Sequence, residues 1–217
     1  ELDGMGCKRT ETIDGRVFFT APRDFVARVN IRSRYAERIY IVLGSFQAET
    51  FDELFEGTRA LPWEELIGRD DRFPVTGHSV KSKLFSIPDC QSIVKKAIVE
   101  RMKRFYPMSV FPETGPVSRA EFFILRDRAW LMLDTSGVPL HKRGYRPETV
   151  TAPLRETLAA ALAKIARPRS DVLFWDPFCG SGTIAIEAAM LMTGRAPGLD
   201  RTFAAQDGKY LPQRAWR

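Results

Sequence analysis

The sequence predicts an α+β N-terminal part followed by the start of an α/β domain with a doubly wound sheet. Up to about residue 150, short β-rich runs alternate with helical patterns, as in small α+β units. Beyond that point, an apolar run and a glycine turn lie between two helical stretches. This order of strand, turn and helix is one unit of a doubly wound fold.

The elements of the N-terminal part follow from local signals. Runs of β-branched and aromatic residues predict strands, and Thr50 and Ser86 are followed three residues later by an acid, as at helix starts. Residues 127 and 128 are the expected turn of a hairpin. The predicted strands cover 16–20, 38–43, 73–80, 120–126 and 129–134, and the predicted helices cover 24–36, a stretch after residue 50, 62–66 and 86–105.

Three further elements are predicted in the C-terminal part. Residues 153–166 are rich in Ala and Leu, which favours a helix. Residues 171–175 are largely apolar and predict a strand buried inside a parallel sheet. Small and apolar side chains after residue 183 predict a second helix.

Composition narrows the class of protein. Of the 217 residues, 44% are hydrophobic, which excludes wholesale disorder. No stretch approaches the ~18 consecutive apolar residues of a membrane span, and no signal peptide leads the chain. Three cysteines are too few for a disulfide framework or a four-ligand zinc site. We therefore expect a cytoplasmic protein with no membrane partner and no metal.

The net charge of +6 permits a polyanionic partner, and the basic residues are unevenly spread. Residues 80–105 hold seven bases and two acids, whereas residues 51–73 hold seven acids and three bases. A charge run is usually one solvated helix face, and this interpretation stays open. The separation of the two signs favours a basic surface that binds a polyanion.

Residues 176–183 read Asp-Pro-Phe-Cys-Gly-Ser-Gly-Thr and follow the predicted strand at its carboxyl end, where ligands bind in open α/β sheets. Glycines let a ligand approach the backbone, and the next helix presents free N–H groups. A P-loop would need Lys after Gly182, and a dinucleotide fingerprint would need a third glycine. Both phosphate-binding interpretations therefore fit poorly.

This motif resembles the S-adenosylmethionine-binding motif of class I methyltransferases that act on exocyclic amino groups. Residues 141–146 (HKRGYR) and 152–160 resemble the entry to the same domain. Residues 75–104, with Ser-Val-Lys-Ser at 79–82, resemble a THUMP RNA-binding domain. In this order, the motifs resemble the bacterial THUMP-domain-containing class I RNA methyltransferases, the family of 23S ribosomal RNA guanine-N2 methyltransferases.

The resemblance implies three parts: an incomplete ferredoxin-like piece over residues 1–50, a THUMP domain over 51–150, and the N-terminal portion of a Rossmann-like methyltransferase domain over 151–217. It implies methyl transfer from S-adenosylmethionine to guanine N2 of large-subunit (23S) ribosomal RNA, by direct attack of the amino nitrogen. Two alternatives stay open. One is a non-catalytic RNA-binding module, and the other is an amino methyltransferase acting on tRNA or DNA, although the THUMP-like part argues against DNA.

Two sets of site residues are expected. Asp176 is expected to attract the ammonium group of the cofactor, and residues 151–154 to lie beside its carboxylate. The full cofactor-binding set is Asp176, Pro177, Phe178, Cys179, Gly180, Ser181, Gly182, Thr183, Pro153 and Leu154. The predicted RNA-binding set is Lys81, Ser82, Lys83, Lys95, Lys96, Lys103, Arg104, Lys142 and Arg143.

The sequence departs from the family at its catalytic motif, Asn-Pro-Pro-Tyr, because it contains no Asn-Pro pair. The residues after Val150 are also fewer than the ~100 of an ordinary domain. We therefore expect a fragment cut at both ends, inactive by itself, and assign no catalytic residue. We interpret His141 as RNA-facing or solvated, because nothing near it in sequence orients it. We interpret Cys179 as a small turn residue rather than a nucleophile.

Overall fold

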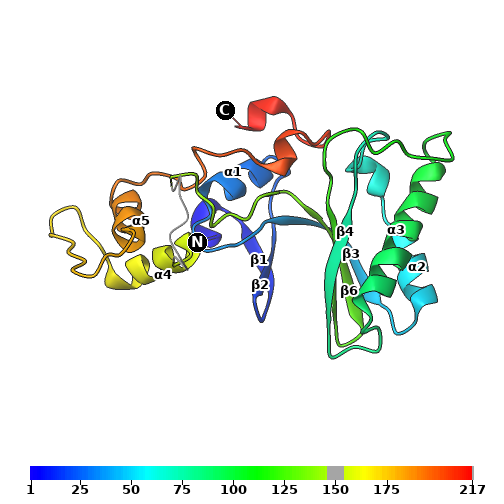
Figure 1. Ribbon diagram of the computed structural model, residues 1–217, viewed down its shortest axis with the longest axis horizontal. Helices are drawn as coiled ribbons and strands as arrows, with labels where there is room; N and C mark the ends of the chain where they lie inside the picture. The colour runs from blue at the N-terminus through cyan, green and yellow to red at the C-terminus, as the bar shows by residue number, and fades with distance from the viewer. Residues whose placement is uncertain (146–153, 217) are drawn as a thin grey trace. The chain divides into compact units, whose positions relative to one another are not determined.

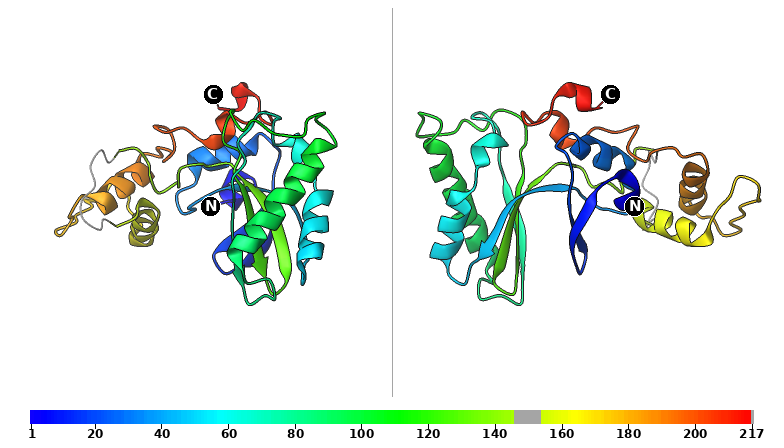
Figure 2. Two further views of the ribbon diagram at one scale, coloured as in Figure 1. Left: turned by 45° about the vertical axis from the view of Figure 1, so that its right-hand side comes forward. Right: turned by 180° about the vertical axis from the view of Figure 1, so that it is seen from behind.

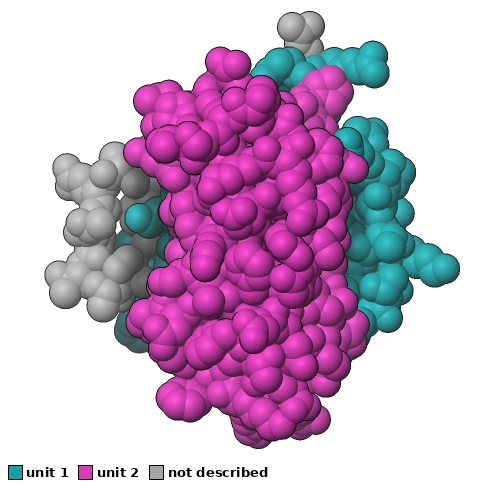
Figure 3. Space-filling view, turned by 90° about the vertical axis from the view of Figure 1, so that its right-hand side faces the viewer, with its two compact units in different colours: residues 1–39, 138–203, 213–217 teal, residues 40–137, 204–212 magenta. Residues whose placement is uncertain are grey.

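The structure is a computed structural model that describes residues 1–145 and 154–216 (Figure 1). The chain divides into two compact units, which Figure 3 shows in different colours. Unit 1 comprises residues 1–39, 138–203 and 213–217, and unit 2 comprises residues 40–137 and 204–212. Within the described ranges, no helix is long and apolar enough to cross a membrane.

Unit 2 is built on a four-stranded sheet. Its strands are β3 (Tyr40–Gln47), β4 (Val75–Val80), β5 (Ala120–Leu125) and β6 (Arg128–Asp134), in the order β3-β6-β5-β4. β4 pairs in parallel with β5, and the other two pairs are antiparallel. The predicted strands of this part are therefore confirmed, with bounds shifted by a few residues.

Two helices lie side by side on one face of this sheet (Figures 1 and 2). α2 (Phe51–Ala60) begins with the expected capping box, in which Thr50 Oγ1 accepts from Glu53 N–H and the Glu53 carboxylate accepts from Thr50 N–H. α3 (Ile87–Lys103) starts after Ser86 as predicted, but the Ser86 side chain makes no capping hydrogen bond. The prediction that the Ser86 side chain caps this helix is therefore wrong.

The β5–β6 hairpin lies at the same end of the sheet as the end of β4. Arg126 and Asp127 are its two turn residues, with φ of 50° and 64°. Positive φ at both positions is the mark of a type I′ turn, which matches the twist of the strands. The turn comes one residue earlier than predicted, because Arg128 already pairs with Leu125. Arg126 N–H donates to Val80 O at 3.2 Å, which joins this turn to the end of β4.

Both tryptophans of unit 2 are buried in its core. Trp63 lies in the short 3-10 helix η2 (Trp63–Glu65), and its indole N–H donates to Thr58 O at 2.8 Å. Trp130 stacks on Phe123 with ring centroids 5.6 Å apart. The indole N–H of a buried Trp needs such a partner, because leaving it unpaired costs free energy. Neither tryptophan is a free stacking surface for a base.

Unit 1 contains a two-stranded ribbon and a short helix in its N-terminal region. β1 (Lys8–Ile13) pairs antiparallel with β2 (Arg16–Thr20), and α1 (Phe25–Arg32) ends four residues before the predicted end. β1 was not predicted, because its side chains are mostly polar and exposed and so lack the apolar alternation of a strand. The hydrophobic core of unit 1 contains Met5, Cys7, Val29, Ile39, Leu140 and Phe203. Short 3-10 helices occur at Asp3–Met5 (η1) and Gln213–Trp216 (η4), and in unit 2 at Ala204–Gln206 (η3).

The C-terminal part of unit 1 holds two packed helices, α4 (Glu156–Ala166) and α5 (Thr183–Met192). The strand predicted at 171–175 is absent and is a wrong prediction. A buried parallel strand requires hydrogen-bonded neighbours on its edges, and the only strands described in unit 1 are those of the β1–β2 ribbon. Leu173 and Trp175 are consequently exposed to solvent.

Gly77 is expected to be required in β4, because a Cβ built there would lie 2.4 Å from Phe122 O of the neighbouring strand. Gly77→Ala should lower the free energy of unfolding of unit 2 by ~1–3 kcal/mol, the usual cost of overpacking. The matched control is Ser79→Ala on the same strand, because the buried Ser79 hydroxyl has no hydrogen-bond partner and its removal should cost little. Urea titration read by hydrogen exchange of the β5 and β6 amides measures both variants. Equal stability of the two would contradict the prediction.

Candidate functional site

The glycine motif forms a tight exposed turn directly before α5. Gly180 and Gly182 have φ of 54° and 73°, a region that side chains with a Cβ rarely adopt. Gly182 N–H donates to Cys179 O at 2.8 Å, and Phe178 N–H donates to Asp176 Oδ1 at 3.3 Å. The turn is therefore a defined structure stabilised by its own backbone and by the Asp176 carboxylate.

The surroundings of this turn leave room for a ligand. A Cβ built on Gly180 meets nothing within 4 Å, and the Phe178 side chain is 94% exposed. The N-cap of α5 is Gly182, which has no side chain to cover the start of the helix. Ser181 Oγ and Thr183 Oγ1 lie 2.9 Å apart at the helix start. The turn thus combines an open glycine backbone, a carboxylate and hydroxyl groups.

The other predicted cofactor residues are only partly described. Leu154 is half-buried and lies two residues before α4. Pro153, with the neighbouring residues 151 and 152, lies outside the described residues. The three cysteines form no disulfide bond with one another. Cys179 is exposed, whereas Cys7 and Cys90 are buried. No group of three or more potential metal ligands occurs in the part of the chain that the structure describes.

Arg143 does not lie on the surface, contrary to its predicted role as an RNA contact. Its side chain is 3% exposed and donates to Leu140 O at 2.7 Å and to Arg34 O at 2.5 Å. A third interaction, at 3.4 Å, joins its Nε to Glu187 Oε1. A guanidinium is buried only when its donors are satisfied, and here carbonyls and a carboxylate do so. Lys142, next to it, is exposed.

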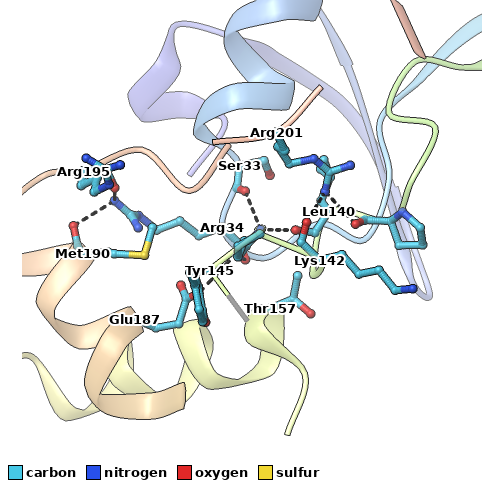
Figure 4. Close-up of polar contacts among 12 residues, drawn as sticks. Ser33, Arg34, Leu140, Lys142, Tyr145, Thr157, Glu187, Met190, Arg195 and Arg201 are labelled. Atoms are coloured by element: carbon cyan, nitrogen blue, oxygen red, sulfur yellow. Dashed lines mark hydrogen bonds and ion pairs between the residues drawn. The ribbon is translucent and has the colours of Figure 1, made fainter. Parts of the chain in front are cut away.

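Glu187 is the buried partner of Arg143 and lies on α5, one helical turn after Thr183. Tyr145 Oη donates to Glu187 Oε1 at 3.0 Å, and Figure 4 shows these two side chains facing one another. Burial raises the pKa of Glu187, and the nearby Arg143 and the Tyr145 hydrogen bond only partly oppose this. The segment 143–145 is thereby joined to the helix that the glycine turn opens.

His141 is oriented by a contact that its sequence neighbours do not reveal. Its Nδ1 lies 2.6 Å from Glu37 Oε2, and Thr157 Oγ1 donates to Glu37 Oε1 at 2.5 Å. Partial burial opposes ionisation of Glu37, but these hydrogen bonds and the nearby charges outweigh it and lower its pKa. The interpretation of His141 as a residue that nothing orients is therefore wrong. The signal was missing because Glu37 lies about a hundred residues away in the sequence.

Three of the predicted RNA-binding residues, Lys81, Ser82 and Lys83, directly follow the C-terminal end of β4 in unit 2. Lys81 is exposed with φ of 51°, and Lys83 N–H donates to Asp127 Oδ1 at 2.6 Å. Ser82 Oγ donates to Val80 O at 2.9 Å and accepts from Asp127 N–H at 3.1 Å. The Lys83 ammonium pairs with Glu49. We call residues 80–85 together with the 126–127 turn the basic corner.

The predicted RNA-binding bases on α3 are mostly engaged in contacts within the protein. Lys95 Nζ donates to Phe73 O at 3.0 Å and to Glu113 Oε1 at 2.5 Å, and it lies 3.5 Å from the Phe73 ring centroid. Lys103 pairs with Glu100, and Lys96 lies over the Phe55 ring at 5.8 Å. Arg104 is exposed at the end of α3. The structure therefore places the consecutive residues Lys81, Ser82 and Lys83 against the 126–127 turn and gives Lys95 a packing role.

Three stretches of the chain match known domain families. Residues 1–40 match the RlmL ferredoxin-like domain, residues 48–134 match the THUMP domain, and residues 143–215 match the RMKL-like methyltransferase domain. The chain matches the THUMP-containing class I RNA methyltransferases. The predicted resemblance to this family is thus confirmed, while the domain limits predicted at residues 50 and 150 stay predictions.

Curated relatives and solved structures agree with this family. The chain is 47% identical over 215 residues to YpsC of Bacillus subtilis (strain 168), which bears the provisional name of an RNA methyltransferase. It is 34% identical over 224 aligned positions to the ribosomal RNA large subunit methyltransferase K/L of Psychromonas ingrahamii. These alignments cover 98% and 100% of the chain but only 55% and 29% of the two relatives. The chain thus spans about half the length, or less, of these members of the family.

Two solved structures share the fold of the whole chain. A protein of Listeria monocytogenes, described as a predicted N6-adenine-specific DNA methylase, is 47% identical with a TM-score of 0.95 and 100% coverage of this chain. SMU.472, provisionally assigned as a methyltransferase and solved in complex with SAH, is 41% identical with a TM-score of 0.91 and 99% coverage. In both cases the chain covers 57% of the solved protein.

Arg143 and its neighbour Lys142 provide a matched test of the buried contact. Arg143→Ala should lower the free energy of unfolding by ~3–5 kcal/mol, because it leaves the buried Glu187 without the guanidinium that is bonded to it. Lys142→Ala, at an exposed position, should change it by less than ~0.5 kcal/mol. Urea titration with hydrogen exchange of the α4 and α5 amides measures the effect in unit 1. A loss in Arg143→Ala no larger than in Lys142→Ala would refute the role of the contact.

Proposed function

We propose that the full-length protein transfers a methyl group from S-adenosylmethionine to an exocyclic amino group of RNA. The observation that carries this proposal is the open Gly180–Gly182 turn at the start of α5, within the stretch that matches a methyltransferase domain. The SAH found in the structure of SMU.472 supports the choice of cofactor. The THUMP domain, which precedes this stretch, would supply the binding of RNA.

The residues of the turn fit such a cofactor. The positive φ values of Gly180 and Gly182 expose backbone without a side chain over it, and the Asp176 carboxylate could attract an ammonium group. The cofactor supplies an electrophilic methyl group when bound. The protein's contribution would be positioning rather than acid–base chemistry. Because no Asn-Pro pair occurs in the 217 residues, we also propose that these residues alone transfer no methyl group.

For the substrate, we favour large-subunit ribosomal RNA and, at the finest level, guanine N2. The name of the Psychromonas ingrahamii relative supports ribosomal RNA. The description of the Listeria monocytogenes protein points instead to adenine in DNA, and the THUMP domain of this chain argues against that choice. An RNA substrate would place the protein in the cytoplasm. A module that binds RNA without catalysis is the second candidate, supported by the basic corner of unit 2.

Gly180→Val should weaken binding of SAH to the full-length protein by at least about tenfold, because a branched side chain would strain the φ of 54° and occupy the open space. Gly194→Val is the matched control: Gly194 has φ of 67° and an equally open Cβ position, but it lies after the end of α5. Isothermal titration calorimetry with SAH measures both. Unchanged affinity in Gly180→Val, or an equal loss in Gly194→Val, would remove the turn from the cofactor site.

Lys81→Ala should reduce the salt dependence of RNA binding, because each lost phosphate contact lowers the slope of log K against log[salt] by ~0.7–0.9. Lys95→Ala should leave this slope unchanged, because its ammonium is engaged by Glu113 and by Phe73 O. Filter binding of a structured ribosomal RNA fragment at several salt concentrations measures the slopes. If Lys95→Ala lowers the slope as much as Lys81→Ala does, the whole of α3 contributes and the corner has no special role.

A further inference from the structure

Phe85 is a solvent-exposed aromatic residue in the basic corner. It is 81% exposed, although both the preceding Leu84 and the nearby Cys90 are buried. A single exposed apolar residue needs no explanation by itself. Phe85 is different because its backbone is held by hydrogen bonds on both sides and because Lys81 and Lys83 lie shortly before it in the chain.

The segment that carries Phe85 is tied down on both sides. On one side, Lys83 N–H and Ser82 Oγ both bond to Asp127, and the buried Leu84 anchors the chain. On the other side, Cys90 N–H donates to Ser86 O at 3.0 Å in the first turn of α3. The exposed ring therefore sits on an ordered backbone, so little conformational entropy would be lost on binding.

The charges of the corner are unbalanced toward the positive. Its three bases, Lys81, Lys83 and Arg126, stand against one acid, Asp127, which accepts from Lys83 N–H. Glu49, outside the corner, pairs with the Lys83 ammonium. Lys81 and Arg126 are exposed, and both lie in the left-handed backbone region with φ near 50°. The Arg126 N–H bond to Val80 O joins the turn to the segment that carries Lys81 and Phe85, so both cations belong to the same corner as the ring.

A comparison with Phe105 shows what is special about the ring. Phe105 is 53% exposed at the other end of α3, but the guanidinium of Arg101 lies 4.7 Å from its centroid and is paired with Glu64. For Phe85, no ring or cation contact occurs among the described residues. Its faces are therefore open to a planar group.

We propose that Phe85 stacks on an unpaired base of the bound RNA while Lys81 and Arg126 contact the adjoining phosphates. This rests on the proposed RNA-binding function and adds a substrate class to it: RNA with an unpaired nucleotide next to a structured region. Aromatic side chains stack on bases of any sequence, whereas cations alone would bind paired and unpaired strands alike. If the exposed ring instead bound a protein partner, replacing Phe85 would leave RNA binding unchanged.

The test measures binding of the full chain to an RNA hairpin with a short unpaired extension and to the same hairpin with a blunt end. Phe85→Ala should weaken binding to the extended hairpin about 5- to 150-fold, which corresponds to ~1–3 kcal/mol per stacked base. It should leave the salt slope and the affinity for the blunt hairpin unchanged. Phe85→Tyr should retain the affinity, Phe85→Leu should not, and Phe105→Ala should bind like the wild type.

Three outcomes separate this inference from the function it rests on. If the unsubstituted chain binds neither hairpin, the proposed RNA-binding function fails. If it binds both hairpins but Phe85→Ala matches Phe105→Ala, RNA binding stands and the stacking role is overturned. If Phe85→Leu binds as well as Phe85→Tyr, the ring is an apolar contact and the stacking role is likewise overturned. Far-UV circular dichroism confirms that each variant is folded.

Discussion

The arrangement of unit 1 depends on a buried charge. Burial of the Arg143 guanidinium would cost several kcal/mol if its donors lacked partners. The chain supplies carbonyl oxygens from residues 34 and 140 and a carboxylate from Glu187, three positions far apart in the sequence. These groups must meet at one point, so the contact defines how α1, the 138–145 segment and α5 lie together. The glycine turn is connected to this contact through α5, because the turn opens the helix that carries Glu187.

Unit 2 is organised by a different constraint, the parallel pairing of β4 with β5. A parallel pair requires a crossover, here through α3, and it aligns the end of β4 with the β5–β6 turn. Lys81, from one segment, and Arg126, from the other, are brought to the same end in this way. Their positive φ values are unusual for residues with long side chains, and hydrogen bonds from the neighbouring segment stabilise the local backbone.

Local signals in the sequence predicted most elements well, and long-range contacts account for the errors. Thr50 and Glu53 lie three residues apart, so their capping box was visible in the sequence. The bonds from Arg143 to Arg34 O and from His141 to Glu37 span about a hundred residues, and no local pattern reveals them. Arg143 and Lys142 look equivalent in the sequence, yet one is buried and the other exposed. The strand at 171–175 has the composition of a buried strand, but composition supplies no pairing partner.

The exposed stretch between α4 and α5 also determines how the chain responds to proteases. Leu173, Trp175 and Phe178 combine side chains that chymotrypsin-like enzymes prefer with a backbone outside any helix or strand. Such segments are cleaved before packed elements, because the chain must extend to enter a protease active site. Limited digestion should therefore nick the chain first between the two helices. Cleavage there would leave α4 and α5 on separate fragments, joined by the packing of the two helices and by the bonds of Arg143 and Tyr145 to Glu187.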